Sequence, residues 1–195
     1  QSRVMELLLS EARRSKKLDM IMKPPVEPLY DVKVTSTDHV RYGPELKDTK
    51  PKGCSYNNCP IVVVEYSEFQ CGFCGRVLPD TRRVLSEFEG KIAWIVRDFP
   101  LSFHDRAKPA AIAAKCAGRQ GKFWDMYHQL FDNQRNLGDK DFDTYAKNIG
   151  LNMGSFSQCI KSPGELADQV DQNMESGMKL GVSGTPAFFI NGRRL

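Results

Sequence analysis

Two cysteines three positions apart offer the clearest chemistry in this sequence. Cys71-Gly72-Phe73-Cys74 stands where an apolar β-branched run gives way to a segment with a helical pattern. A cysteine at the start of a helix lies beside unpaired backbone N–H groups and the positive end of the helix dipole, which lower its pKa and make it a nucleophile. The second cysteine returns to the same helix face one turn later and can attack a mixed disulfide formed by the first. The spacing therefore predicts thiol–disulfide exchange at Cys71 and Cys74.

The other cysteines leave two alternatives to redox chemistry. The pair could be half of a structural zinc site that Cys54 and Cys59 complete, or it could be a purely structural disulfide. The short gap between Cys54 and Cys59 and the Asn-rich loop around them favour a local disulfide over a zinc site. Cys116 and Cys159 complete an even set of 6 cysteines with wide spacing. Such a set fits an oxidising compartment, where disulfides persist.

Two further features point to the same chemistry. Glu65 lies inside the apolar run, where a carboxyl group is costly unless it has a partner or a role. A carboxyl group beneath the two cysteines can take the proton that the second thiol must lose; the alternative is that Glu65 points to solvent at the edge of a strand. Residues 181–186 directly precede another apolar run, and a cis bond between Thr185 and Pro186 fits such a tight turn.

The order of apolar patterns predicts an α/β fold. Strand patterns begin at Tyr30 and end at Tyr42, and they recur over Ile61–Tyr66, Lys91–Arg97 and Ala187–Ile190, the last followed by the hairpin turn Asn191-Gly192. A helix over Gly72–Glu89 joins two of these strands, which implies a parallel crossover. Residues 104–180 are mostly helical, with segments at Ala107–Ala117, Lys122–Phe131, Asp141–Ile149 and Pro163–Leu180.

Residues 1–23 have a helical pattern of their own, which ends at Pro24 and Pro25. Its apolar spacing is too irregular for a coiled coil. The segment is expected either to pack on its own domain or to form an oligomerisation arm, and the pattern favours neither. The chain has no initiator Met and residues 1–10 lack the features of a signal peptide, so a mature or trimmed form is expected.

The composition argues against two classes of function. The 28 basic residues nearly balance 24 acidic ones, so a concentrated basic face for nucleic acid is not expected. No stretch approaches the roughly 20 apolar residues of a membrane helix. With 195 residues, the chain is long enough to bury a substantial core as one domain with an insertion.

Taken together, these motifs resemble the DsbA-like thiol–disulfide oxidoreductases. The stretches that carry the resemblance, in the order of the family, are Val62–Cys74, Asp98–His104, Ala113–Ala117, Gln120–Trp124 and Gly181–Gly192. They are similar to the family's active-site signature, its helical insertion, and its cis-proline loop with the following hairpin. The resemblance covers about residues 30–195 and implies a thioredoxin fold with an all-helical subdomain inserted after the Lys91–Arg97 strand.

The resemblance also implies a division of the chain. Residues 1–29 would be an N-terminal helical arm and linker, and residues 30–100 the first part of the thioredoxin fold. Residues 101–180 would be the inserted helical subdomain, and residues 181–195 the second part of the thioredoxin fold. The helix that follows the hairpin in the family is missing after Leu195, so truncation of the chain is expected.

Individual roles follow from the resemblance as well. Cys71 would be the exposed nucleophile and Cys74 the buried resolving thiol, with Glu65 at the family's buried acidic position. Pro186 would face the disulfide, and the backbone at Thr185 would hold a substrate segment by strand-like hydrogen bonds. Gly72 and Phe73, between the cysteines, are expected to contact the substrate.

Two structural disulfides are implied by the same resemblance. Relatives often carry one in the helical insertion, where Cys116 and Cys159 fall. Cys54 and Cys59 would form the second, which closes a very short loop and adds less stability than a long one. The redox-active disulfide Cys71–Cys74 would be the only cofactor, with no metal site.

The function implied is the introduction of disulfides into exported proteins in a periplasmic or otherwise extracytoplasmic space. The substrates would be unfolded or reduced exported proteins, and a membrane protein would be the redox partner. The family's strongest oxidants carry Pro-His between the cysteines, whereas Gly72-Phe73 offers no side-chain donor. We therefore expect a less extreme oxidant, at roughly −120 to −200 mV.

Two alternatives to this function stay open. The Gly-aromatic dipeptide with Thr-Pro also resembles disulfide isomerases, which oligomerise through an N-terminal extension, so an oligomeric isomerase or reductase is one alternative. A thiol-based copper or zinc module is the other. Among the remaining residues, His104 is expected to cap or pack, and Phe123 and Trp124 are expected to lie in the core of the insertion.

Overall fold

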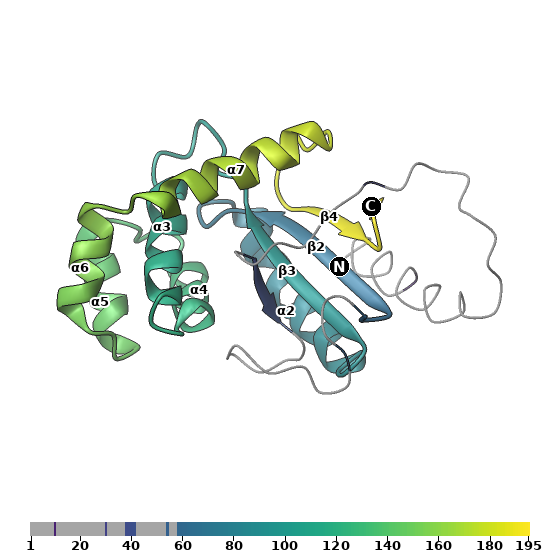
Figure 1. Cartoon of the computed structure of the whole chain (residues 1–195), viewed down its shortest axis with the longest axis horizontal. Coiled ribbons are helices and arrows are strands. Elements are labelled where there is room, and N and C mark those ends of the chain that lie inside the picture. Colours follow the sequence, from purple (N-terminus) through teal and green to yellow (C-terminus); the bar gives the residue numbers. More distant parts are fainter. Residues whose placement is uncertain (1–9, 11–29, 31–37, 42–53, 55–57) are drawn as a thin grey trace.

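The computed structural model describes residues 38–41 and 58–195, together with Ser10, Tyr30 and Cys54 (Figure 1). Apart from Ser10, the predicted N-terminal arm over residues 1–23 lies outside these residues, as does the strand pattern around Val32 and Val34. The division at residue 29 therefore stays a prediction. Within the described part of the chain, no helix has the length and apolar character needed to cross a membrane.

A mixed sheet in the order β1-β3-β2-β4-β5 forms the centre of the described fold. Its strands are β1 (His39–Arg41), β2 (Ile61–Ser67), β3 (Ile92–Asp98), β4 (Ala187–Ile190) and β5 (Arg193–Arg194). Strands β2 and β3 are parallel and are joined by helix α2 (Gly72–Glu87), which confirms the predicted crossover. Strand β4 runs antiparallel to β2 and forms the predicted hairpin with β5.

Helices occupy the chain between β3 and β4. They are α3 (Ala107–Gly118), α4 (Phe123–Asp132), α5 (Asp139–Asn148), α6 (Met153–Lys161) and α7 (Glu165–Lys179). In Figure 1, α3 to α6 are grouped to one side of the sheet, and α7 runs back from this group towards it. This is the helical insertion that the sequence predicted. The separate helix α6 was not predicted; Asn152 caps it by accepting a hydrogen bond from Ser155 N at 2.9 Å.

The two faces of the sheet pack against different helices. On one face, Ile61 and Val63 of β2 join a large cluster with α2, which includes Val77 and Leu85. On the other face, β2 contributes to a smaller cluster that α7 covers. Successive side chains of a strand alternate between faces, so Glu65, two positions after Val63, lies on the α2 face.

A buried ion pair fixes the chain where it leaves the sheet for the insertion. Asp98, the last residue of β3, pairs with Lys115 of α3 at 3.1 Å, and both side chains are buried. Asn173 of α7 donates to the same carboxylate at 3.3 Å. Because buried charges must be paired and hydrogen-bonded, these contacts restrict the position of the loop that follows Asp98.

Candidate active site

Cys71 is the residue immediately before helix α2. Its backbone is extended, with φ −71° and ψ 112°, and its side chain makes no capping hydrogen bond. Its carbonyl oxygen accepts from Gly75 N at 3.2 Å and from Gln134 Nε2 at 2.8 Å. Both the helix and the insertion therefore hold the backbone of Cys71. The expectation of an exposed nucleophile is wrong, because Cys71 is only 4% exposed and packs within the large core cluster.

The pKa of Cys71 is lowered from 9.0 to about 5. The largest cause is a hydrogen bond from the Cys74 thiol, and burial acts in the opposite direction. The side chain of Thr185 and the backbone N–H groups of Cys74 and Phe73 lower the pKa further. Cys71 is therefore a thiolate at neutral pH, as a nucleophile in thiol exchange must be.

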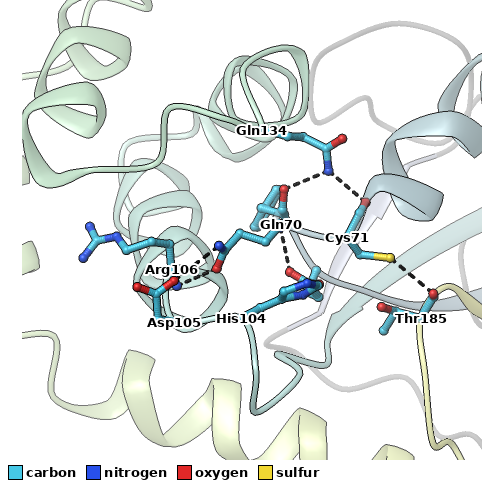
Figure 2. A network of polar contacts seen from close by, with 9 residues as sticks. Gln70, Cys71, His104, Asp105, Arg106, Gln134 and Thr185 are labelled. Atoms are coloured by element: carbon cyan, nitrogen blue, oxygen red, sulfur yellow. Dashed lines mark hydrogen bonds and ion pairs between the residues drawn. The ribbon is translucent and has the colours of Figure 1, made fainter.

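The loop before β4 lies against the sulfur of Cys71. Its Thr185–Pro186 peptide bond is cis, as the sequence predicted. In its thiol form, Cys71 Sγ donates to the carbonyl oxygen of Thr185 at 3.3 Å, a contact visible in Figure 2. The backbone of this loop is thus placed beside the reacting sulfur.

Cys74 lies in the first turn of α2 and is fully buried. Burial is the largest cause that raises the pKa of Cys74, and its hydrogen bond to Cys71 and the nearby Glu65 raise it further. Ser67 acts in the opposite direction. The two free cysteines are therefore unequal, because one favours the thiolate and the other stays protonated.

Glu65 lies beneath this pair and has no exposed surface. Trp94 Nε1 of β3 donates to Glu65 Oε2 at 2.9 Å. Burial raises the pKa of Glu65 from 4.5 to about 7, although the hydrogen bond from Trp94 and the nearby hydroxyl group of Ser67 oppose the shift. The alternative of a Glu65 that points to solvent is wrong, and this carboxyl group can gain or lose a proton near neutral pH.

A second buried carboxyl group close to Cys71 was not predicted from the sequence. Glu68 follows directly after β2, and its side chain is hydrogen-bonded to His104 Nδ1 from the loop after β3. Its other oxygen accepts from Gln70 N at 2.6 Å. Burial raises the pKa of Glu68, and the contacts with Gln70 and His104 oppose this. The expectation that His104 caps or packs therefore missed its pairing with Glu68.

Hydrogen bonds with residues after β3 hold the turn between β2 and α2 (Figure 2). Gln134, which lies between α4 and α5, donates to the carbonyl oxygens of Phe69 and Cys71 at 2.9 and 2.8 Å. Gln70 accepts from Arg106 N at 2.5 Å. These partners are distant in sequence and carry no motif, so no signal in the sequence could identify them.

An apolar cavity of about 660 Å³ opens beside the active-site helix. Phe73 and Val77 of α2 line one side, and Thr185, Pro186 and Phe188 line the other. Phe73 is 66% exposed. Gly72 is exposed as well but does not line this cavity. Of the predicted substrate-contacting residues, the structure therefore brings three together around one cavity.

Two disulfides stabilise the chain away from the reactive pair. Cys116 of α3 is bonded to Cys159 of α6, and Cys54 is bonded to Cys59. Both pairings agree with those that the resemblance implied. Among the residues that the structure describes, no group of three or more His, Cys, Asp or Glu side chains is arranged to hold a metal ion.

Comparison with known proteins places these features in a family. A family profile described as thioredoxin matches residues 56–195. Over 139 residues the chain is 35% identical to the Na(+)/H(+) antiporter NhaA 1 of Mycolicibacterium vanbaalenii, a match that covers 70% of this chain and 22% of the antiporter. The antiporter of the same name from Salinispora arenicola is 37% identical over 136 residues, which are 69% of this chain and 21% of the antiporter. The chain thus spans about a fifth of the length of these curated relatives.

Solved structures share the fold at lower sequence identity. A thioredoxin-like oxidoreductase from Silicibacter pomeroyi superimposes with a TM-score of 0.68 at 21% identity, over 83% of this chain and 84% of that protein. The thiol-disulfide exchange protein alpha-DsbA2 from Wolbachia pipientis has a TM-score of 0.66 at 19% identity, over 97% of this chain and 88% of that protein. The chain therefore belongs to the thioredoxin family, and it shares the fold of these thiol–disulfide exchange proteins.

Proposed function

We propose that this chain introduces disulfide bonds into exported proteins by exchange at Cys71 and Cys74. The observation that carries the proposal is the unequal state of the two thiols, with a lowered pKa at Cys71 and a raised pKa at the buried Cys74. A stabilised Cys71 thiolate favours the dithiol form over the disulfide form. The disulfide form is then an oxidant, because its reduction to the dithiol by a substrate releases free energy.

The reaction begins with the Cys71–Cys74 disulfide. A substrate thiolate attacks Cys71 Sγ, the bond to Cys74 breaks, and the Cys74 thiolate takes up a proton. Glu65, with a pKa of about 7, is the buried acid in place to supply that proton. A second substrate thiolate then attacks the substrate sulfur of the mixed disulfide. The substrate disulfide forms, and Cys71 leaves as a thiolate of low pKa.

The apolar cavity beside Pro186 is the proposed substrate site. Its walls are Phe73 on one side and the cis-proline loop on the other. An extended, unfolded segment would add to the loop as a strand does, with main-chain hydrogen bonds to Thr185 and apolar side chains in the cavity. Unfolded or reduced exported proteins present such segments, whereas folded proteins bury them.

The proposed setting is the periplasm or another extracytoplasmic space. The two disulfides remote from the active site support an oxidising compartment. Each turnover leaves the enzyme reduced, so we propose that a membrane redox partner reoxidises it. Antiport is not part of this proposal, because the matched residues make up about a fifth of the antiporters that carry that name.

The proposal is tested with the full chain in two parallel assays. One follows the oxidation of a reduced, unfolded protein with several disulfides, and the other follows the rescue of the same protein with scrambled disulfides. We expect fast oxidation and slow rescue, and a loss of both when Cys71→Ala or Cys74→Ala is introduced. Efficient rescue by an oligomeric chain would favour the isomerase instead. Stoichiometric zinc or copper(I) bound by the reduced protein without exchange activity would favour the metal module.

A further inference from the structure

Ser67 is a buried hydroxyl group on the same side of the sheet as the reactive thiols. It is the last residue of β2 and is 3% exposed. It follows Glu65 by two positions, so both side chains lie on the face that packs against α2. Cys74 projects from α2 towards this face, in the same buried cluster as Val63. Ser67, Glu65 and Cys74 therefore lie in the same buried layer between β2 and α2.

The hydrogen bonds around Glu65 leave its Oε1 atom without a partner in this layer. Trp94 Nε1 occupies Oε2. Within the described residues, neither Glu65 Oε1 nor Ser67 Oγ has a hydrogen-bond partner of standard geometry, although both atoms are buried. Buried polar atoms without partners are costly, so each needs a structural or functional explanation.

The electrostatic effect of Ser67 on both groups agrees with this placement on one face. Its hydroxyl lowers the pKa of the Cys74 thiol and lowers the pKa of the Glu65 carboxyl group. A hydroxyl group carries one proton to donate and two lone pairs to accept, so it can serve both neighbours at once. Other side chains beside Glu65 are Trp94, which holds Oε2, and Phe188 of β4 and Val96 of β3, which lie opposite Glu65 in the sheet. Among these neighbours, Cys74 is the group that exchanges a proton in the reaction.

We propose that Ser67 is a positioning residue that relays a proton between Glu65 Oε1 and Cys74 Sγ. The inference rests on the proposed function. When a substrate thiolate bonds to Cys71 Sγ, the electron pair of the broken S–S bond goes to Cys74. Ser67 then gives its hydroxyl proton to Cys74 Sγ and takes a proton from Glu65. Glu65 has lost one proton, Cys74 has gained one, and Ser67 is unchanged; reoxidation runs the same transfer in reverse.

A double-mutant cycle of Ser67→Ala and Glu65→Gln tests this relay in the full chain. The readout is the single-turnover rate of exchange with a reduced peptide, measured against pH. Ser67→Ala should slow the step in which Cys74 leaves by about tenfold or more, since a positioned acid normally contributes at least that much. In the Glu65→Gln background the same change should alter the rate by less than about twofold, because two residues of one relay are not independent. Effects that multiply would overturn the proposal, as would a Ser67→Ala protein that behaves like the parent.

Two further measurements separate a relay from a structural role. Ser67→Thr keeps the hydroxyl group and should restore the rate and its pH profile. Removal of a buried hydroxyl group without a partner is nearly neutral for folding, so Ser67→Ala should keep the free energy of unfolding of the parent below pH 4.5, where Glu65 is protonated in the folded and the unfolded state. A Ser67→Thr protein as slow as Ser67→Ala, both folded, would overturn the relay.

The titration of Glu65 distinguishes failure of the relay from failure of the proposed function. Ser67 lowers the pKa of Glu65, so in Ser67→Ala this pKa should rise above its value of about 7. Nuclear magnetic resonance of the carboxyl carbon measures it without any turnover. A parent protein that does not exchange thiols would refute the proposed function. An unchanged Glu65 titration in Ser67→Ala would overturn the relay, whatever the activity of the parent.

Discussion

Replacement of Glu65 with Gln should remove a pH-dependent loss of stability from the oxidised protein. The folded protein holds the pKa of Glu65 at about 7, against an ordinary value of 4.5, because the group is completely buried. Between these pH values the folded state keeps a proton that the unfolded state has already released. Glu65 therefore makes the free energy of unfolding fall as the pH rises from 4.5 to 7. Outside that range the contribution of Glu65 does not change with pH.

The size of this loss follows from the shift. A shift from 4.5 to about 7 corresponds to about 3 kcal/mol of stability, which is present in full below pH 4.5 and lost above pH 7. The causes of the shift are burial and the contacts with Trp94 and Ser67, so it does not depend on a free thiol. The oxidised protein is the right sample, because neither Cys71 nor Cys74 titrates in it.

Denaturant unfolding of the parent and of Glu65→Gln across this pH range checks the prediction. The difference in the free energy of unfolding between the two proteins should grow in favour of the variant by about 3 kcal/mol from acidic to neutral pH. His39 changes stability in the opposite direction, because burial lowers its pKa from 6.5 to about 4. Its contribution is the same in both proteins and cancels in the difference. A difference that does not vary with pH would refute the raised pKa of Glu65.

Two further predictions concern the surroundings of Glu65 and the disulfide of the insertion. Trp94→Phe removes the donor to Glu65 Oε2, and loss of a hydrogen bond to a charged group should raise the pKa of Glu65 further, by about one unit. Trp124→Phe, a buried tryptophan of α4, should leave this pKa unchanged; equal shifts in both variants, measured by nuclear magnetic resonance, would contradict the assignment. Removal of the Cys116–Cys159 disulfide, which spans 43 positions, should lower the free energy of unfolding by about 4 kcal/mol in the chain-entropy model. Denaturant unfolding measures this loss, and a value below about 1 kcal/mol would show that the model does not apply to this crosslink.

The parts of the site that were predicted from the sequence are local in the chain. The β-branched run, the cysteine pair and the following helix are contiguous, so the position of Cys71 at the start of α2 follows from short-range patterns. The same holds for β4, whose observed bounds Ala187–Ile190 equal the predicted ones, and for the hairpin at Asn191-Gly192. The burial of Glu65 also follows from its place in a run that is apolar on both faces of the sheet.

The remaining parts depend on contacts between distant segments. Trp94 reaches Glu65 because β3 lies beside β2, and the strand pattern alone does not show which indole meets which carboxyl group. His104 meets Glu68 only after the chain has left the sheet and turned towards the insertion. Gln134 is an ordinary polar residue until the fold places it over the turn before α2. Helix α6 was missed because it is short and only two of its residues, Phe156 and Cys159, are buried.

The structure also bears on the dipeptide between the cysteines. Gly72 and Phe73 supply no side-chain donor to Cys71, and on that ground we expected a less extreme oxidant. The pKa of Cys71 is lowered first by the Cys74 thiol and then by the side chain of Thr185 and by backbone N–H groups, and none of these depends on the side chains of the dipeptide. The lowered pKa of Cys71 therefore comes first from Cys74, and then from the cis-proline loop and the backbone at the start of α2. Phe73, whose ring is exposed at the edge of the cavity and lies beneath the Arg76 guanidinium at 4.2 Å, is the residue of the dipeptide that the proposed substrate would contact.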